Sequence, residues 1–183
     1  MNITNIEEYV KDLTDKVSLV DGLFEDTVLA YSGNLDTLMK EIQTNLLEVD
    51  LVPISTIERY FTALSSEVYF VSAKLEKLGL FDSLSKAKAQ ETYNTKYLEY
   101  QQTKTDGKKP TVAEITANAE TASLYDTTLS DVYNKAYKTL KNKISAAETM
   151  ISTLSKILSH RMQESQLTTQ QTERQILNES NIF

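Results

Sequence analysis

The chain has 183 residues, of which 40% are apolar and 25% are charged, with only 4 glycines, 2 prolines and no cysteine. So few turn-formers exclude a β-sandwich, a barrel or a doubly wound sheet, and the lack of cysteine excludes disulfides and thiolate chemistry. The formal net charge is −7, and residues 1–50 hold 11 acidic side chains against 3 basic ones. No apolar run approaches the ~18 residues that span a bilayer, and the acidic N-terminus lacks a basic leader. We therefore expect a helix-rich intracellular protein without a membrane segment.

Two helices are predicted before Pro53. The first covers about 4–20, where apolar residues recur at spacings of three and four. The second begins at about 21–25 and runs to about 50, with Ser32-Gly33 as a weak point inside it. Pro53 ends this helix, because the residue before a proline is pushed out of the α region. Residues 1–52 thus form a predicted acidic N-terminal helical segment.

A seam with the spacing of a coiled coil begins at Ile54. Its apolar residues alternate spacings of three and four over more than three heptads: Ile54, Ile57, Phe61, Leu64, Val68, Val71, Leu75 and Leu78. Residues 54–103 therefore predict one long helix, interrupted near Gly79, or two helices. Residues 104–110 (KTDGKKP) predict a loop, and Thr111 with Glu114 matches a capping box that opens a short helix to about 121.

The last predicted helix, about 124–164, carries a stripe that becomes a second heptad seam in its C-terminal half: Tyr125, Leu129, Val132, Ala136, Leu140, Ile144, Ala147, Ile151, Leu154 and Leu158. We expect an all-α protein in which residues 53–165 form a long antiparallel helical hairpin with coiled-coil-like seams. The N-terminal helices are expected to pack on this hairpin or to be exchanged with a neighbouring copy. Residues 166–183 are interpreted as a polar tail, whose Ile182-Phe183 tip is a docking peptide or a disordered end. Two seams exceed what one chain of this size buries, so we expect a homo-oligomer.

The residues that enzymes and metal sites require are missing. His160 is the single histidine, and neither a phosphate-binding glycine loop nor a nucleophile motif occurs. Neighbouring acids such as Glu7 and Glu8 diverge around a helix and do not form an acid/base pair. We expect no enzymatic activity, no cofactor and no metal.

Lysine and tyrosine interleave in two stretches. Residues 86–109 contain six lysines, and residues 135–161 contain six lysines and arginines against the single acid Glu148. This pattern is typical of sequence-tolerant single-strand binding, because ammonium groups neutralise phosphates and rings stack on exposed bases. In the last helix the candidate DNA-binding residues are Lys135, Tyr137, Lys138 and Lys141. The alternative is that the tyrosines are core or interface residues whose hydroxyls reach water.

The stretch KYLEYQQTKTDGKKP (96–110), followed by NAETASLYDTTL and a helix ending SKILSHRMQE (155–164), resembles the UvsY-type recombination mediators of bacteriophages. GKKPTVAEI (107–115) is also similar to a run in small phage proteins of recombination context. The resemblance covers about residues 60–164. It implies a helical protomer that assembles into a ring, binds single-stranded DNA and helps load a recombinase against a single-strand-binding protein, in the host cytoplasm.

By position, the resemblance implies a DNA-contacting group made of Lys96, Tyr97, Tyr100, Lys104, Lys108 and Lys109. It implies an oligomer interface along the second seam, at Leu140, Ile144, Ile151, Leu154 and Leu158. Two other functions stay open: a virion structural or assembly protein, and an acidic adaptor or inhibitor of a host nucleic-acid-binding protein.

Overall fold

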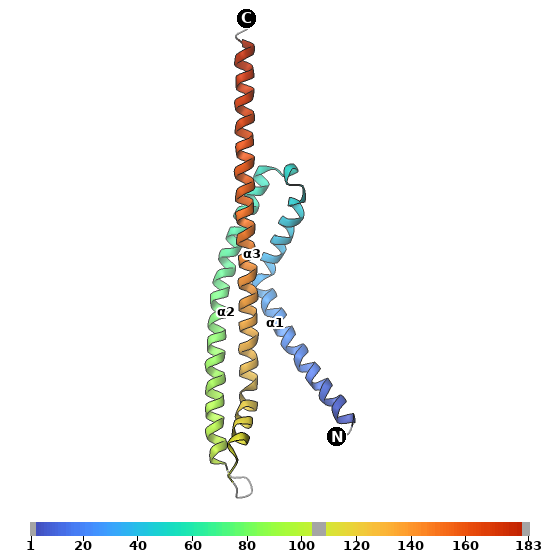
Figure 1. Ribbon diagram of the computed structural model, residues 1–183, viewed down its shortest axis with the longest axis vertical. Coiled ribbons are helices and arrows are strands. Elements are labelled where there is room, and N and C mark those ends of the chain that lie inside the picture. The colour runs from blue at the N-terminus through green and yellow to red at the C-terminus, as the bar shows by residue number, and fades with distance from the viewer. Residues whose placement is uncertain (1–2, 104–108, 181–183) are drawn as a thin grey trace. The chain divides into compact units, whose positions relative to one another are not determined.

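The structure, a computed structural model, describes residues 3–103 and 109–180, and it describes the side chains of 18–47, 51–103 and 109–172. It is all-α, as predicted: no described residue forms a strand. The helices are α1 (Ile3–Asn45), α2 (Ile54–Gln102) and α3 (Val112–Ser180), and a 3₁₀-helix, η1 (Leu46–Leu51), follows α1 (Figure 1).

The helices are longer than the sequence predicted. α1 is a single helix through residues 20–25 and α3 is a single helix through residues 121–124, so the helix boundaries predicted at these two places were wrong. α1 also continues through the weak point at Ser32-Gly33, and α2 is one helix through Gly79. A glycine inside a helix costs only about 1 kcal/mol, which the burial of neighbouring apolar side chains outweighs. α3 also extends through most of the predicted polar tail, to Ser180. The Ile182-Phe183 tip lies outside the described residues.

Two predicted helix boundaries are confirmed by hydrogen bonds. The Pro53 carbonyl accepts from the backbone N–H of Thr56 at 2.9 Å and of Ile57 at 3.2 Å, which makes the first turn of α2. The predicted capping box opens α3: Thr111 N–H donates to Glu114 Oε2 at 2.8 Å, and Glu114 N–H donates to Thr111 Oγ1 at 3.3 Å. The bonds that the Thr111 N–H and the Thr111 hydroxyl donate to the Glu114 carboxylate lower the pKa of Glu114.

The chain divides into two compact units, and each helix contributes to both. Unit 1 comprises residues 1–33 and 72–142, and unit 2 comprises residues 34–71 and 143–183. The division therefore cuts across the helices and does not follow the predicted segments 1–52, 53–165 and 166–183.

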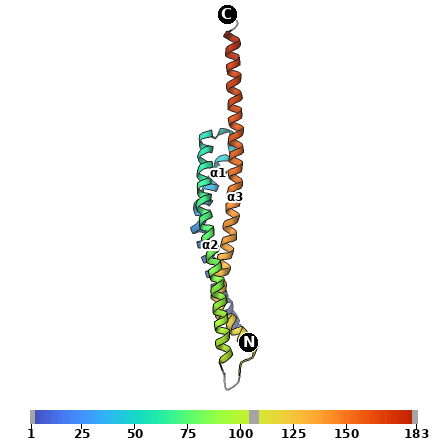
Figure 2. The ribbon, with the colours of Figure 1, turned by 90° about the vertical axis from the view of Figure 1, so that its left-hand side faces the viewer.

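The core of unit 1 lies where the three helices meet. Val28 of α1, Leu78 of α2 and Ala136 of α3 are buried there, with Phe24, Tyr31, Tyr133 and Tyr137 packed around them. Residues further along α2 contact residues earlier in α3: Gly79 lies against Tyr137, and Thr92 donates a hydrogen bond to Asp126. α2 and α3 of this unit therefore run side by side in opposite directions, as Figures 1 and 2 show.

Unit 2 has its own core of fully buried side chains from all three helices. Leu35 and Ile42 of α1, Ile57, Leu64 and Val71 of α2, and Ala147 and Leu154 of α3 are at most 1% exposed. Tyr60 joins them, and its hydroxyl accepts from Asn45 Nδ2 at 2.7 Å and donates to Glu41 Oε1 at 3.1 Å. An ion pair of Lys143 with Asp36 links α3 to α1.

Candidate nucleic-acid interface

Three lysines of α3 form an exposed arc in unit 1. Lys135, Lys138 and Lys141 follow one another at spacings of three, so neighbours lie about 60° apart around the helix. All three side chains are exposed, and within the described residues none of them is in an ion pair. We call these residues the lysine arc. It offers three ammonium groups over about 9 Å of helix, which suits the backbone of a nucleic acid.

The second predicted group lies at the end of α2. Lys96, Tyr97 and Tyr100 are half-buried, and the Tyr97 ring lies 6.0 Å from that of Tyr93. Lys96 Nζ donates to Glu99 Oε2 at 2.7 Å, and this contact raises the pKa of Lys96. Lys109 is exposed beyond the loop, whereas Lys104 and Lys108 lie outside the described residues.

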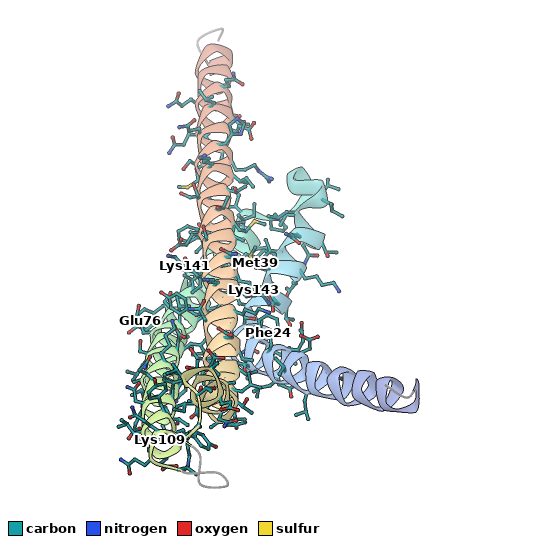
Figure 3. All side chains as sticks on the ribbon, turned by 60° about the horizontal axis from the view of Figure 1, so that its bottom comes forward. Phe24, Met39, Glu76, Lys109, Lys141 and Lys143 are labelled. Atoms are coloured by element: carbon teal, nitrogen blue, oxygen red, sulfur yellow. The ribbon has the colours of Figure 1, made fainter. Side chains whose placement is uncertain are left out.

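The structure does not bring these two groups into one patch. Tyr137, which follows the first lysine of the arc by two residues, lies level with Gly79 of α2. Lys96 is 17 residues further along α2, or about 26 Å at 1.5 Å per residue. Figure 3 shows Lys141 and Lys109 well apart. A strand that contacts both groups has to extend over several nucleotides.

Tyr137 and the predicted assembly seam belong to the interior of the chain. The half-buried Tyr137 ring packs against the unit 1 core, 3.3 Å from where a Cβ on Gly79 would stand, so the core occupies this side of the ring and leaves less of it for a base. For this residue the alternative reading, a core tyrosine, is the better one. Leu140 and Leu154 are at most 1% exposed and Ile144 is 7% exposed, while Ile151 and Leu158 are half-buried. The chain itself covers this seam, which leaves little of it for another copy.

Lysines 86, 88 and 96 each bind a carboxylate of their own helix. Lys86 pairs with Asp82 at 2.7 Å and Lys88 with Glu91 at 3.2 Å. The Lys88–Glu91 and Lys96–Glu99 pairs are exposed on both sides, whereas the side chain of Asp82 is only 13% exposed. Exposed pairs contribute only about 0–1 kcal/mol, so for the candidate residue Lys96 exchanging the carboxylate for a phosphate costs little.

Asp82 ties α2 to α3 in unit 1. Its carboxylate accepts hydrogen bonds at 3.1 Å from both Ser130 Oγ and Asn134 Nδ2, besides the Lys86 pair. Burial raises the pKa of this carboxyl, but the bonds from Lys86, Asn134 and Ser130 outweigh it and hold the pKa below its usual value. A groove of about 460 Å³ lies alongside, lined by Lys86 and Tyr93 of α2 and by residues of α3 that include Glu120 and Asp131. The two acids make the groove unfavourable for phosphate.

The sequence prediction was wrong for one aromatic residue of α3. Tyr125 was assigned to the apolar stripe of the last helix, but its side chain is 76% exposed. The inward-facing positions of this stretch are polar, since Ser123 and Ser130 are buried and Asp126 accepts a hydrogen bond from Thr92 of α2, so apolar periodicity alone could not identify the buried face.

The described residues contain no group of three or more His, Cys, Asp and Glu side chains able to hold a metal ion. His160 is exposed, with its Nδ1 3.5 Å from Glu164 Oε1. In the part of the chain that the structure describes, no helix combines the length and apolar character needed to cross a bilayer.

No family model, curated protein or solved structure matches the chain.

Proposed function

We propose that the protein is a non-enzymatic recombination mediator of the phage type, which binds single-stranded DNA in the host cytoplasm and helps load a recombinase against a single-strand-binding protein. The lysine arc is the observation that carries this proposal. Three exposed ammonium groups on one side of a helix, without carboxylate partners in the described structure, suit successive phosphates.

Binding uses the two groups in different ways. The lysine arc holds phosphates, and a strand that continues toward the end of α2 reaches Lys96, Tyr97, Tyr100 and Lys109. The half-buried Tyr97 and Tyr100 offer ring surface to bases, and Lys96 exchanges Glu99 for a phosphate. In a ring of several copies, such weak sites add through multivalency.

The test is binding of a fluorescent oligothymidine across a salt series. Substituting Lys135, Lys138 and Lys141 by Gln removes up to three phosphate contacts. We expect weaker binding, and a slope of log K against log salt reduced by about 2, since each contact on a single strand contributes about 0.7.

A matched control removes the same charge elsewhere: the triple variant Lys40→Gln, Lys88→Gln and Lys156→Gln changes three exposed lysines outside the candidate residues. It should keep most of the slope. Equal losses in the two variants would show a general charge effect, and no binding by the wild type at 50 mM salt would refute the proposal.

One observation favours the adaptor function as a second candidate. On α1, the exposed acids Asp21, Glu25 and Asp26 lie next to the exposed Leu19 and Leu23, a combination that suits a basic protein surface. Deleting residues 1–50 would remove buried residues from both cores, so substitution of the three acids by Asn and Gln is the better test. This change should raise affinity for DNA in a mediator, and abolish binding to a basic partner in an adaptor.

A further inference from the structure

α2 carries a second heptad repeat on its exposed side, within unit 1. Ala73, Lys77, Leu80, Leu84, Ala87, Glu91, Asn94 and Leu98 follow one another at alternating spacings of four and three, and all of them are exposed. We call these eight residues the outer seam. Leu80, Leu84 and Leu98 are each more than half exposed, at 57%, 57% and 55%.

The outer seam is separate from the face that builds the core. Leu78 and Asp82, which lie against α1 and α3, are turned by more than 100° around the helix from Leu84. Thus α1 and α3 do not cover the outer seam in the described structure. A face with leucine and alanine at seven-residue repeats is suited to knobs-into-holes packing with another helix.

We propose that the outer seam pairs antiparallel with the outer seam of a second copy of this chain. The charges within the seam favour this partner and this direction. In a parallel pair Lys77 would face the partner's Lys77, and Glu91 would face the partner's Glu91. In an antiparallel pair centred between Leu80 and Leu84, the ammonium group of Lys77 lies within about 6 Å along the axis of the partner's Glu91.

The same register places leucines at the centre. Leu80 faces the partner's Leu84 and Leu84 faces the partner's Leu80, which makes two apolar layers related by the two-fold axis. Lys77 then meets the partner's Ala87, and Ala73 meets the partner's Glu91, so no like charges face each other in these layers. The Lys88–Glu91 pair is exposed on both sides, and Glu91 can therefore turn toward the partner. This inference does not rest on nucleic-acid binding.

The first test measures the mass of the assembly by light scattering. We expect the wild type to be at least twice the 20.7 kDa of the chain, and the variant Leu80→Glu, Leu84→Glu to have at most half the wild-type mass. Leu124→Glu is the matched control, because Leu124 is 61% exposed on α3, outside the seam, and this variant should keep the wild-type mass. Circular dichroism checks that all variants keep their helical content.

A wild type that stays at the mass of one chain up to about 100 μM would overturn the proposal and assign the seam to a different protein. The proposal would also be overturned if the variant Leu80→Glu, Leu84→Glu kept the wild-type mass, or if Leu124→Glu lost as much mass as that variant.

The second test determines the direction by disulfide formation, which the absence of natural cysteine makes unambiguous. Ala73→Cys mixed with Glu91→Cys should give a mixed disulfide under mild oxidation, since these positions share a layer. Ala73→Cys alone should not form a disulfide with itself, because the two thiols lie about 27 Å apart along an antiparallel pair. Efficient linkage of Ala73→Cys to itself would contradict the antiparallel arrangement.

Discussion

The Asp82 carboxylate has three hydrogen-bond partners: Lys86 on its own helix, α2, and Ser130 and Asn134 on α3. Because those partners lower its pKa, the folded chain binds this proton less readily than the unfolded chain does. The stabilisation is therefore present above the usual pKa of 3.8 and is lost as the pH falls through the lower folded-state value.

Asp82→Asn should lower the free energy of unfolding at pH 7 by about 1–2 kcal/mol, because the amide replaces a charged acceptor of bonds from Ser130, Asn134 and Lys86. Urea unfolding at fixed protein concentration measures the difference. The difference in stability between the wild type and Asp82→Asn should narrow as the pH falls below about 4, because the Asp82 carboxyl takes up a proton first in the unfolded chain and only at lower pH in the folded chain. Asp131→Asn, at an exposed carboxylate, is the control and should change little. A difference in the free energy of unfolding that stays constant with pH would contradict this role for Asp82.

At the residue scale, the sequence predicted the same DNA-binding role for the lysines and for Tyr137 of the last helix, but the structure places them differently. Lys135, Lys138 and Lys141 are exposed as a DNA-binding role requires, whereas Tyr137 lies against the core. The signal was present: Tyr133, Tyr137, Leu140 and Ile144 follow spacings of four, three and four, which places both tyrosines on the edge of the apolar stripe.

At the element scale, apolar periodicity predicted an all-α protein, but it could not distinguish one long helix from two. Ser32-Gly33 shows why. The Ser32 hydroxyl is buried and donates to the Val28 carbonyl at 2.9 Å, so tertiary packing holds the helix through a locally weak pair. The partners that bury Ser32 are distant in the sequence and leave no local signal.

The second seam of α3 is an internal element of the chain. Leu154→Ala should therefore lower the free energy of unfolding by about 2–5 kcal/mol, the usual cost of a cavity at a fully buried leucine. Leu167→Ala, at a leucine of the same helix that is 59% exposed, should cost less than about 0.5 kcal/mol. Thermal unfolding compares the two variants, and a small effect at Leu154 would restore this seam as a surface for assembly.

Residues 162–172 of α3 pack against no other part of the chain that the structure describes. Every side chain from 162 to 172 is exposed, and the sequence there is rich in Gln, Thr and Ser, which stabilise an isolated helix poorly. Hydrogen exchange should be at least about 100-fold faster in residues 162–172 than in residues 136–154. Equal protection of the two segments would show that another surface covers this part of the helix.

At the scale of the whole molecule, the division into two units has no counterpart in composition. Unit 1 is held by contacts between residues far apart in the sequence, such as Lys74 Nζ with the Tyr31 carbonyl at 3.5 Å and Asp82 with Asn134. Such pairs cannot be derived from local patterns, because each position is an ordinary polar residue of a helix. The excess of acidic residues in 1–50 is visible in the sequence, but the division of this segment between the two units is not.

The net charge of −7 is compatible with DNA binding because charges act locally. At 0.1 M salt the Debye length is about 10 Å, so acids further than this from the lysine arc repel a phosphate weakly. The proposed DNA binding therefore depends on the local positive charge of the lysine arc.

Lysine footprinting tests this claim most directly. The protein is acetylated lightly with and without a saturating oligothymidine, and the modification of each lysine is quantified by mass spectrometry. Lys135, Lys138 and Lys141 should be protected at least several-fold in the complex, while Lys40 and Lys156, exposed elsewhere, should react as before. Unchanged modification of the lysine arc, in a sample whose DNA is shown to be bound, would contradict the account.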